Sequence, residues 1–353
     1  MRGIDHIVFL TILSERMILS YKNKILTLSA LCGALLIAFI LTIVFDPENS
    51  AARGAFWTAL DPKFKDKVNL IRLDGEDKVQ LIRNNGRWFV NFEDSLYPAR
   101  QNKVDDMINV LSRRGSYPVR SRSEVAQEKL MLTEAEAQRI IINDGDDNTL
   151  LDVLVGAPDA TLKEIYIRLS GNKEIRSGKD VFSPLFVSRQ GWYDLRLFPD
   201  HEAEGLTVSS VQRVVAQPPA LEVLNASIDG EDASSIPIAE AYTLIRDGNG
   251  WKLEDSGEIM DSLAVEAYIR RIIDFEANDF TSALRANDPA FTQPSASSGR
   301  LVLETGDGKR RIITIGPVFA DKYGAAVSGS PYVYLLADWQ LARLFDKLPL
   351  ATK

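Results

Sequence analysis

Side chains that commonly carry out chemistry are scarce in this sequence. Its 353 residues include one cysteine, Cys32, and two histidines, His6 and His201. A single cysteine excludes an intramolecular disulfide framework, a CxxC redox pair and a zinc ribbon. With two widely separated histidines, an HExxH metal-binding helix is excluded as well. His201 lies in the acidic stretch 200–204, which we expect to be a solvated loop rather than a catalytic site.

Glycine-rich nucleotide-binding motifs are also missing. Gly156 and Gly316 follow apolar runs and precede prolines, so they end strands instead of opening a phosphate-binding loop. Residues 144–148 resemble the start of a calcium-binding loop, but Thr149 and Val155 stand where that loop needs glycine and glutamate. We therefore expect no catalytic residue, no cofactor, no metal site and no enzymatic activity. A hydrolase with paired carboxylates stays open as an alternative, because 49 acidic residues are too many to nominate a pair.

The longest apolar run covers residues 25–45. Seventeen of these 21 residues are apolar, and none is charged. At about 1.5 Å per residue, a helix of this length reaches roughly 30 Å, the thickness of a bilayer core. The run is longer than the apolar core of a cleavable signal peptide, and no small-x-small cleavage site follows it. The sequence therefore predicts an uncleaved transmembrane helix, joined to the rest of the chain by a linker at 46–66.

Charge on either side of this run predicts its orientation. Four basic and two acidic residues precede it, a net charge of +2, and subtracting this from the total of −8 leaves −10 for the remainder. Positive segments tend to stay inside, so residues 1–24 are expected in the cytoplasm and the bulk in the periplasm of a bacterium, anchored once in the inner membrane. The acidic remainder argues against a nucleic-acid partner. Whether the chain starts at Met1 or Met17 stays open.

An internal duplication is the next strongest pattern. Residues 81–88 recur as 244–251: in each copy an apolar pair enters an Asn/Asp/Gly turn and a tryptophan leaves it, which is typical of a β-hairpin. A helix with apolar residues at i, i+3, i+4 and i+7 follows in both copies, from Val104 and from Val265. Two further strands and a short helix follow each. The positions expected to have structural roles in the two copies are Trp88, Trp251, Gly86, Gly250, Gly156 and Gly316.

These patterns predict an α+β fold. The expected architecture is an N-terminal transmembrane helix followed by two duplicated units, 67–190 and 191–350. Each unit is expected to be an antiparallel sheet packed with one main helix and a short terminal helix. Residues 220–239 are extra sequence in the second copy and are expected to form a surface loop or hairpin.

The order of these features resembles that of a known family. They are a short N-terminus, an apolar anchor, the hairpin at 82–88, the strand ending at 154–156 and the segment Trp192-Tyr193-Asp194-Leu195-Arg196-Leu197-Phe198. The sequence is similar to the bacterial domain-of-unknown-function family 4340 over about residues 68–350. Members of that family are single-pass envelope proteins, often encoded beside gliding-motility-type ABC transporter components. The resemblance implies the inner membrane and integral-membrane transporter subunits as partners, and it transfers no catalytic residues.

We therefore expect a membrane-anchored periplasmic interaction or accessory protein of an ABC-type transporter or another envelope complex. The alternative is a periplasmic ligand-binding module that holds a lipid, glycan or peptide in a cleft between the two repeats, because interfaces between domains are common pocket sites.

Overall fold

The computed structural model describes residues 26, 28–29, 32–39, 56–93, 95–220, 240–295, 298–319 and 321–351. Its contacts divide the chain into two compact units, each described below by itself. Unit 1 comprises the described parts of Met1–Lys65, Val110–Arg139 and Leu151–Pro184, and unit 2 those of Asp66–Asn109, Ile140–Leu150 and Leu185–Lys353. The predicted boundaries 67–190 and 191–350 follow a sequence duplication rather than contacts, and they stay a prediction.

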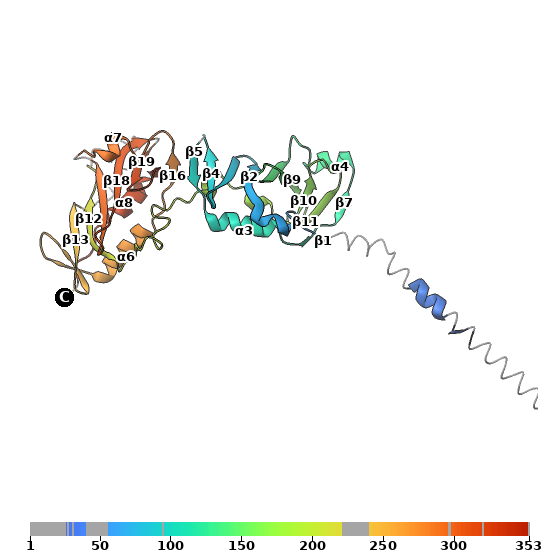
Figure 1. The fold of residues 1–353 in the computed structure, drawn as a ribbon, viewed down its shortest axis with the longest axis horizontal. Helices are drawn as coiled ribbons and strands as arrows, with labels where there is room; N and C mark the ends of the chain where they lie inside the picture. Colours follow the sequence, from blue (N-terminus) through green and yellow to red (C-terminus); the bar gives the residue numbers. More distant parts are fainter. Residues whose placement is uncertain are drawn as a thin grey trace, which may run out of the picture. The chain divides into compact units, whose positions relative to one another are not determined.

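Unit 2 contains a nine-stranded antiparallel sheet (Figure 1). Its order is β15-β14-β13-β12-β17-β18-β19-β20-β16. Along β12, Val214 and Ala216 are buried while Val215 and Gln217 are more exposed, the alternation expected of a pleated strand. The strands are β12 (Val211–Gln217), β13 (Tyr242–Asp247), β14 (Gly250–Leu253), β15 (Ile259–Met260), β16 (Asp279–Thr281), β17 (Gly299–Thr305), β18 (Arg310–Phe319), β19 (Lys322–Val327) and β20 (Val333–Leu336).

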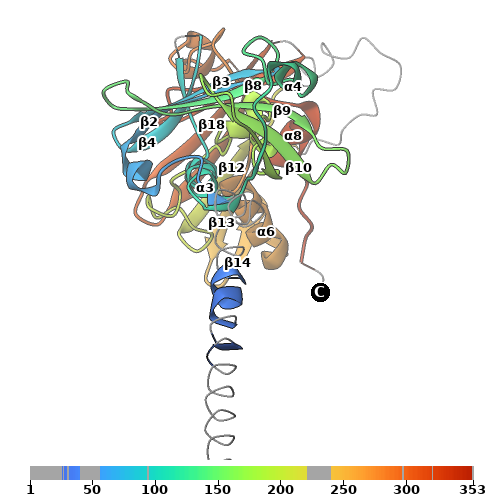
Figure 2. The same ribbon diagram turned by 90° about the vertical axis from the view of Figure 1, so that its right-hand side faces the viewer.

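The same unit also contains strands from the first half of the chain, in the order β5-β4-β3-β2-β8. Figure 2 labels four of them, β2, β3, β4 and β8. The five strands are β2 (Val68–Asp74), β3 (Lys78–Asn84), β4 (Arg87–Phe92), β5 (Ser95–Pro98) and most of β8 (Gln138–Asp144). These five strands lie in the same sequence-dependent order as β15-β14-β13-β12-β17: in both groups the first four strands along the chain run outward from the fifth.

Unit 1 contains a second group of strands, β9-β10-β11-β7, and a two-stranded sheet, β1-β6. The group repeats the chain order of β18-β19-β20-β16 in unit 2. The elements are β1 (Phe56–Trp57), β6 (Gly115–Ser116), β7 (Val119–Ser121), most of β9 (Thr149–Pro158), β10 (Glu164–Leu169), β11 (Ile175–Lys179) and the helix α4 (Glu124–Lys129).

Both predicted hairpins are confirmed. β3 and β4 are joined by Asn85 and Gly86, with φ of 49° and 79°, and two successive positive φ values define the turn that matches strand twist. β13 and β14 are joined by a two-residue turn in which Gly248 has φ of 59°. Trp88 and Trp251 both leave their turns into buried positions, 2% and 1% exposed.

The predicted helical stripes are confirmed as well. α3 (Gln101–Leu111) buries Val104, Met107, Ile108 and Leu111, and α6 (Ser262–Ile273) buries Val265, Tyr268, Ile269 and Ile272. Asp261 begins α6 by accepting hydrogen bonds from two backbone N–H groups of its first turn. The remaining helices are short: α7 (Pro289–Thr292), α8 (Asp338–Leu344) and the 3₁₀ turns η1 (Pro62–Lys67), η2 (Ser183–Leu185) and η3 (Arg189–Trp192).

The predicted α+β class, with one main helix packed on each sheet, is wrong. The described residues form twenty strands in three sheets, whereas the two main helices, α3 and α6, have only 11 and 12 residues. The reason is one of size. A 12-residue helix such as α6 is about 18 Å long and about 10 Å wide. Nine strands spaced about 4.8 Å apart span roughly 38 Å, so one helix leaves most of the sheet uncovered.

The predicted membrane anchor is also contradicted. In the part of the chain that the structure describes, no helix combines the length and the apolar character needed to cross a bilayer. Within 25–45 the structure describes residues 26, 28–29 and 32–39, all of them helical. The single-pass inner-membrane localisation with a periplasmic bulk depends on that anchor and is corrected with it. Residues 1–24, the part of the linker from 46 to 55 and residues 221–239 lie outside the described residues.

Candidate ligand-binding pocket

The segment from Trp192 to Asp200 belongs to unit 2. Tyr193 and Arg196 form isolated β-bridges with Ala99 and Glu276, so its backbone is hydrogen-bonded on both sides. On one side Asp194 N–H donates to the Pro98 carbonyl over 2.8 Å, at the end of β5. On the other, Leu197 N–H donates to the Phe275 carbonyl over 2.9 Å, just after α6. We call residues 192–200 the central segment.

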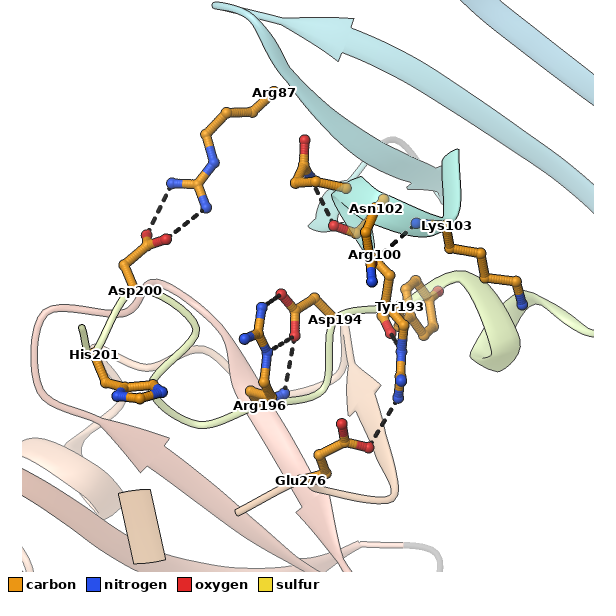
Figure 3. A network of polar contacts seen from close by, with 12 residues as sticks. Arg87, Arg100, Asn102, Lys103, Tyr193, Asp194, Arg196, Asp200, His201 and Glu276 are labelled. Atoms are coloured by element: carbon orange, nitrogen blue, oxygen red, sulfur yellow. Dashed lines mark hydrogen bonds and ion pairs between the residues drawn. The ribbon is translucent and has the colours of Figure 1, made fainter. Parts of the chain in front are cut away.

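Two ion pairs hold the central segment (Figure 3). The Asp194 carboxylate is 6% exposed and accepts two hydrogen bonds from the Arg196 guanidinium, at 2.8 and 2.6 Å. This contact raises the pKa of Arg196. Arg100 donates to the Tyr193 carbonyl over 3.0 Å and to Glu276 over 2.8 Å. A buried carboxylate needs such a partner, because an unpaired charge in the interior is very costly. We assign these pairs a structural role.

A pocket of about 310 Å³ opens beside the end of this segment, wholly within unit 2. Its wall combines the start of β4, the end of the central segment together with Glu204, and the turn between β19 and β20. The lining residues on which the argument depends are Arg87, Asp200, Glu204, Arg311, Tyr332 and Tyr334.

Two arginine–carboxylate pairs border the pocket. Arg87, the first residue of β4, donates two hydrogen bonds to Asp200, at 2.9 and 3.0 Å (Figure 3). Arg311 of β18 donates to Glu204 over 2.8 Å. Asp200 raises the pKa of Arg87, so this guanidinium stays charged. Both carboxylates are about half exposed, 45% and 52%, and such pairs contribute only about 0–1 kcal/mol to stability.

Aromatic rings form the apolar side of the pocket. Tyr332 is half-buried and lies 5.9 Å from the ring centroid of Tyr97 and 5.6 Å from that of Phe280. Tyr334 is buried, and burial raises its pKa to about 12. Burial also raises the pKa of Tyr332, against the opposing effect of Arg87. Neither phenol therefore loses its proton near neutral pH, and both rings are suited to stacking.

The six positions expected to have structural roles lie in different places. Trp88 lines the pocket, and its backbone N–H and C=O are both bound by the Gln101 side chain, at 2.8 and 3.0 Å. Trp251 packs under Arg246, 4.7 Å from its ring centroid. Gly86 occupies the β3–β4 turn and Gly250 begins β14. The remaining two, Gly156 and Gly316, lie on β9 and β18.

The acidic stretch that we expected to be a solvated loop borders the pocket. His201 in it is largely covered: its side chain is 17% exposed, with Nδ1 at 3.3 Å from the Leu206 carbonyl and Nε2 at 3.6 Å from Asp274. Sequence reasoning missed Arg87 and Arg311 because their partners lie 113 and 107 residues away. The one available signal was the alternation of acids at 200, 202 and 204. Within the described ranges, no three His, Cys, Asp or Glu side chains are placed to hold a metal ion.

No protein-family model, curated protein or solved structure matches this chain. The resemblance to family 4340 stays a prediction.

Proposed function

We propose that this protein is a binding module and that the pocket of unit 2 holds its ligand, from the lipid, glycan or peptide classes. The observation that carries the proposal is the pocket itself. Its volume of about 310 Å³ falls at the lower end of the range for small-molecule sites, about 300–1,000 Å³. Such sites combine apolar and aromatic walls with a few placed polar groups, which describes Tyr332, Arg87 and Arg311.

The state of the ionisable groups supports recognition rather than proton transfer. A general acid or base works best with a pKa near the operating pH. Here the pKa of Arg87 is raised by Asp200, and the pKa values of Tyr332 and Tyr334 are raised by burial. Each group keeps one charge state around neutral pH, as a site that recognises charge and shape requires.

A thermal-shift measurement tests this proposal, because a ligand that binds the native state raises its melting temperature. The probes are dodecanoate, a chitin disaccharide and a set of tetrapeptides. Pro331→Trp places an indole at the exposed rim of the pocket, and Lys309→Trp places one on an exposed turn outside its lining. A stabilising probe should lose its effect in Pro331→Trp and keep it in Lys309→Trp. If no probe class stabilises the wild-type protein, or if both variants respond equally, the proposal fails.

A second proposal concerns a protein partner. Residues 192–198, part of the family resemblance, make up most of the central segment, which is hydrogen-bonded to residues 98–100 and 275–277, and that coincidence favours an accessory role beside transporter subunits. Affinity isolation from detergent-solubilised cells should recover an ATPase and its permease in fixed ratio. Recovery of background proteins alone would remove this second proposal and leave the first untouched.

A further inference from the structure

We propose that the pocket recognises an acidic peptide segment and that residues 200–204 of this chain, in its wall, now pair with its arginines as an internal mimic of that ligand. This inference rests on the proposed binding function and names the ligand class. It starts from the two arginines: Arg87 and Arg311 come from different sheets of unit 2, and both line the same pocket. Each one binds a carboxylate of the same short stretch, Asp200 or Glu204.

The stretch 200–204 has the shape of a bound peptide turn. Glu204 N–H donates to the Asp200 carbonyl over 3.0 Å, closing a single turn, and Leu206 N–H donates to the His201 carbonyl over 2.8 Å. One turn places side chains four residues apart on the same side. The two carboxylates therefore reach two separate guanidinium groups. Any peptide with acids at i and i+4 can present the same pair in the same way.

Both internal pairs are open to replacement, because each carboxylate is about half exposed. Glu204 is 52% exposed, so water can receive its carboxylate, whereas the Arg311 side chain is 20% exposed and held in the pocket wall. Arg87 and Asp200 are exposed to similar extents, 51% and 45%. A carboxylate from outside can replace Asp200 with the two-pronged geometry that arginine favours, and it can replace Glu204 in its single hydrogen bond to Arg311. The half-buried Tyr332 ring then offers a stacking surface beside the arginines.

The test removes the internal mimic and supplies it from outside. The probe is the acetylated and amidated heptapeptide with the sequence of residues 199–205, and its affinity is measured by calorimetry. If the stretch 200–204 occupies the arginines about nine-tenths of the time, the double variant Asp200→Asn/Glu204→Gln should bind the peptide about tenfold more tightly than wild type. Binding should weaken as salt is raised from 50 to 500 mM.

Three controls accompany this measurement. Asp346→Asn breaks a different exposed arginine pair, with Arg271, and should leave peptide affinity at the wild-type value. Adding Arg87→Gln and Arg311→Gln to the double variant should abolish binding. A peptide with Asn and Gln at the two acidic positions should not bind the double variant.

The outcomes separate the two levels of the proposal. If the folded double variant does not bind the acidic peptide while a probe from the thermal-shift set still stabilises the wild type, acidic-peptide recognition fails and the binding function stands. If neither binds, both fail. If free glutarate binds the double variant as tightly as the peptide does, the site recognises a free dicarboxylate and the peptide proposal is overturned.

Discussion

β9 in unit 1 and β18 in unit 2 occupy the same place in the repeated strand order, and each contains one glycine next to an irregularity in pairing. The cover over that glycine differs. A side-chain carbon at Gly156 would clash with the carbonyl oxygen of Leu130, a backbone atom. A side-chain carbon at Gly316 would clash with the ring of Phe291, a side chain of α7.

The residue after each glycine explains the difference. Ala157 follows Gly156, and its N–H donates to the Leu130 carbonyl over 2.9 Å, which fixes that carbonyl against the strand. Pro317 follows Gly316 and has no N–H to donate, so an aromatic ring fills the equivalent space. The two copies therefore share a strand order but cover the equivalent glycine differently. A hydrogen-bonded backbone carbonyl covers Gly156, and an aromatic side chain covers Gly316.

Of the substitutions that test this comparison, Gly156→Ala should lower the free energy of unfolding most. The Leu130 carbonyl cannot move without breaking its bond to Ala157, so the strand or the cover must shift. Forcing extra atoms into a packed site costs about 1–3 kcal/mol, and we expect the upper end here. Urea unfolding gives the free energy, and hydrogen exchange should show the loss of protection at Ala157. An unchanged unfolding midpoint would contradict a fixed backbone cover.

Gly316→Ala should cost less, about 1 kcal/mol, because the Phe291 ring can turn or shift. In a Phe291→Leu background the same change should cost less still, since the obstructing ring is gone. A double-mutant cycle measures this coupling. Equal costs in both backgrounds would show that something other than the ring opposes the new methyl group.

The tryptophan hairpins offer a third contrast. Arg246 lies 4.7 Å from the Trp251 ring centroid and also donates to the carbonyls of Val211 and Val208. Arg83 lies 5.8 Å from the Trp88 ring centroid. Arg246→Gln should lower the free energy of unfolding by about 1–2 kcal/mol, and Arg83→Gln by about 0.5 kcal/mol or less. A larger loss for Arg83→Gln than for Arg246→Gln in urea titrations would contradict the stronger support that Arg246 gives to its hairpin.

The smallest effect is expected at the turns after β8 and β17. The pKa of Asp144 is lowered mainly by hydrogen bonds from Asn148, and that of Asp307 mainly by its bond to Lys309. A lowered folded-state pKa contributes stability above the unfolded value, about 3.9, that is lost as the pH falls through the folded value. Asp144→Asn and Asp307→Asn should therefore each lower the melting temperature at pH 6, and this effect should fade as the pH falls toward 2. High salt should shrink the Asp307 effect more than the Asp144 effect, because the main partner of Asp307 is the charged Lys309 and that of Asp144 is the neutral Asn148.

Local patterns predicted the hairpins and the helical stripes because the necessary information lies within a few residues. The positive φ at Gly86 and the buried spacing from Val104 to Leu111 both follow from neighbours in sequence. The mostly β character of the fold could not be predicted from local patterns, because it depends on how many strands, far apart in the sequence, join one sheet. The pocket was missed for a similar reason: its charged pairs join Arg87 to Asp200 and Arg311 to Glu204 across more than a hundred residues.

The double-sided pairing of the central segment has a mechanical consequence. Tension applied along the segment between Trp192 and Phe198 loads its hydrogen bonds to residues 98–100 and 275–277 in parallel rather than one after another. Bonds sheared together resist a pull far better than bonds that unzip singly. This stretch of unit 2 is therefore expected to be a point of high resistance under load, able to transmit force while the flanking turns yield first.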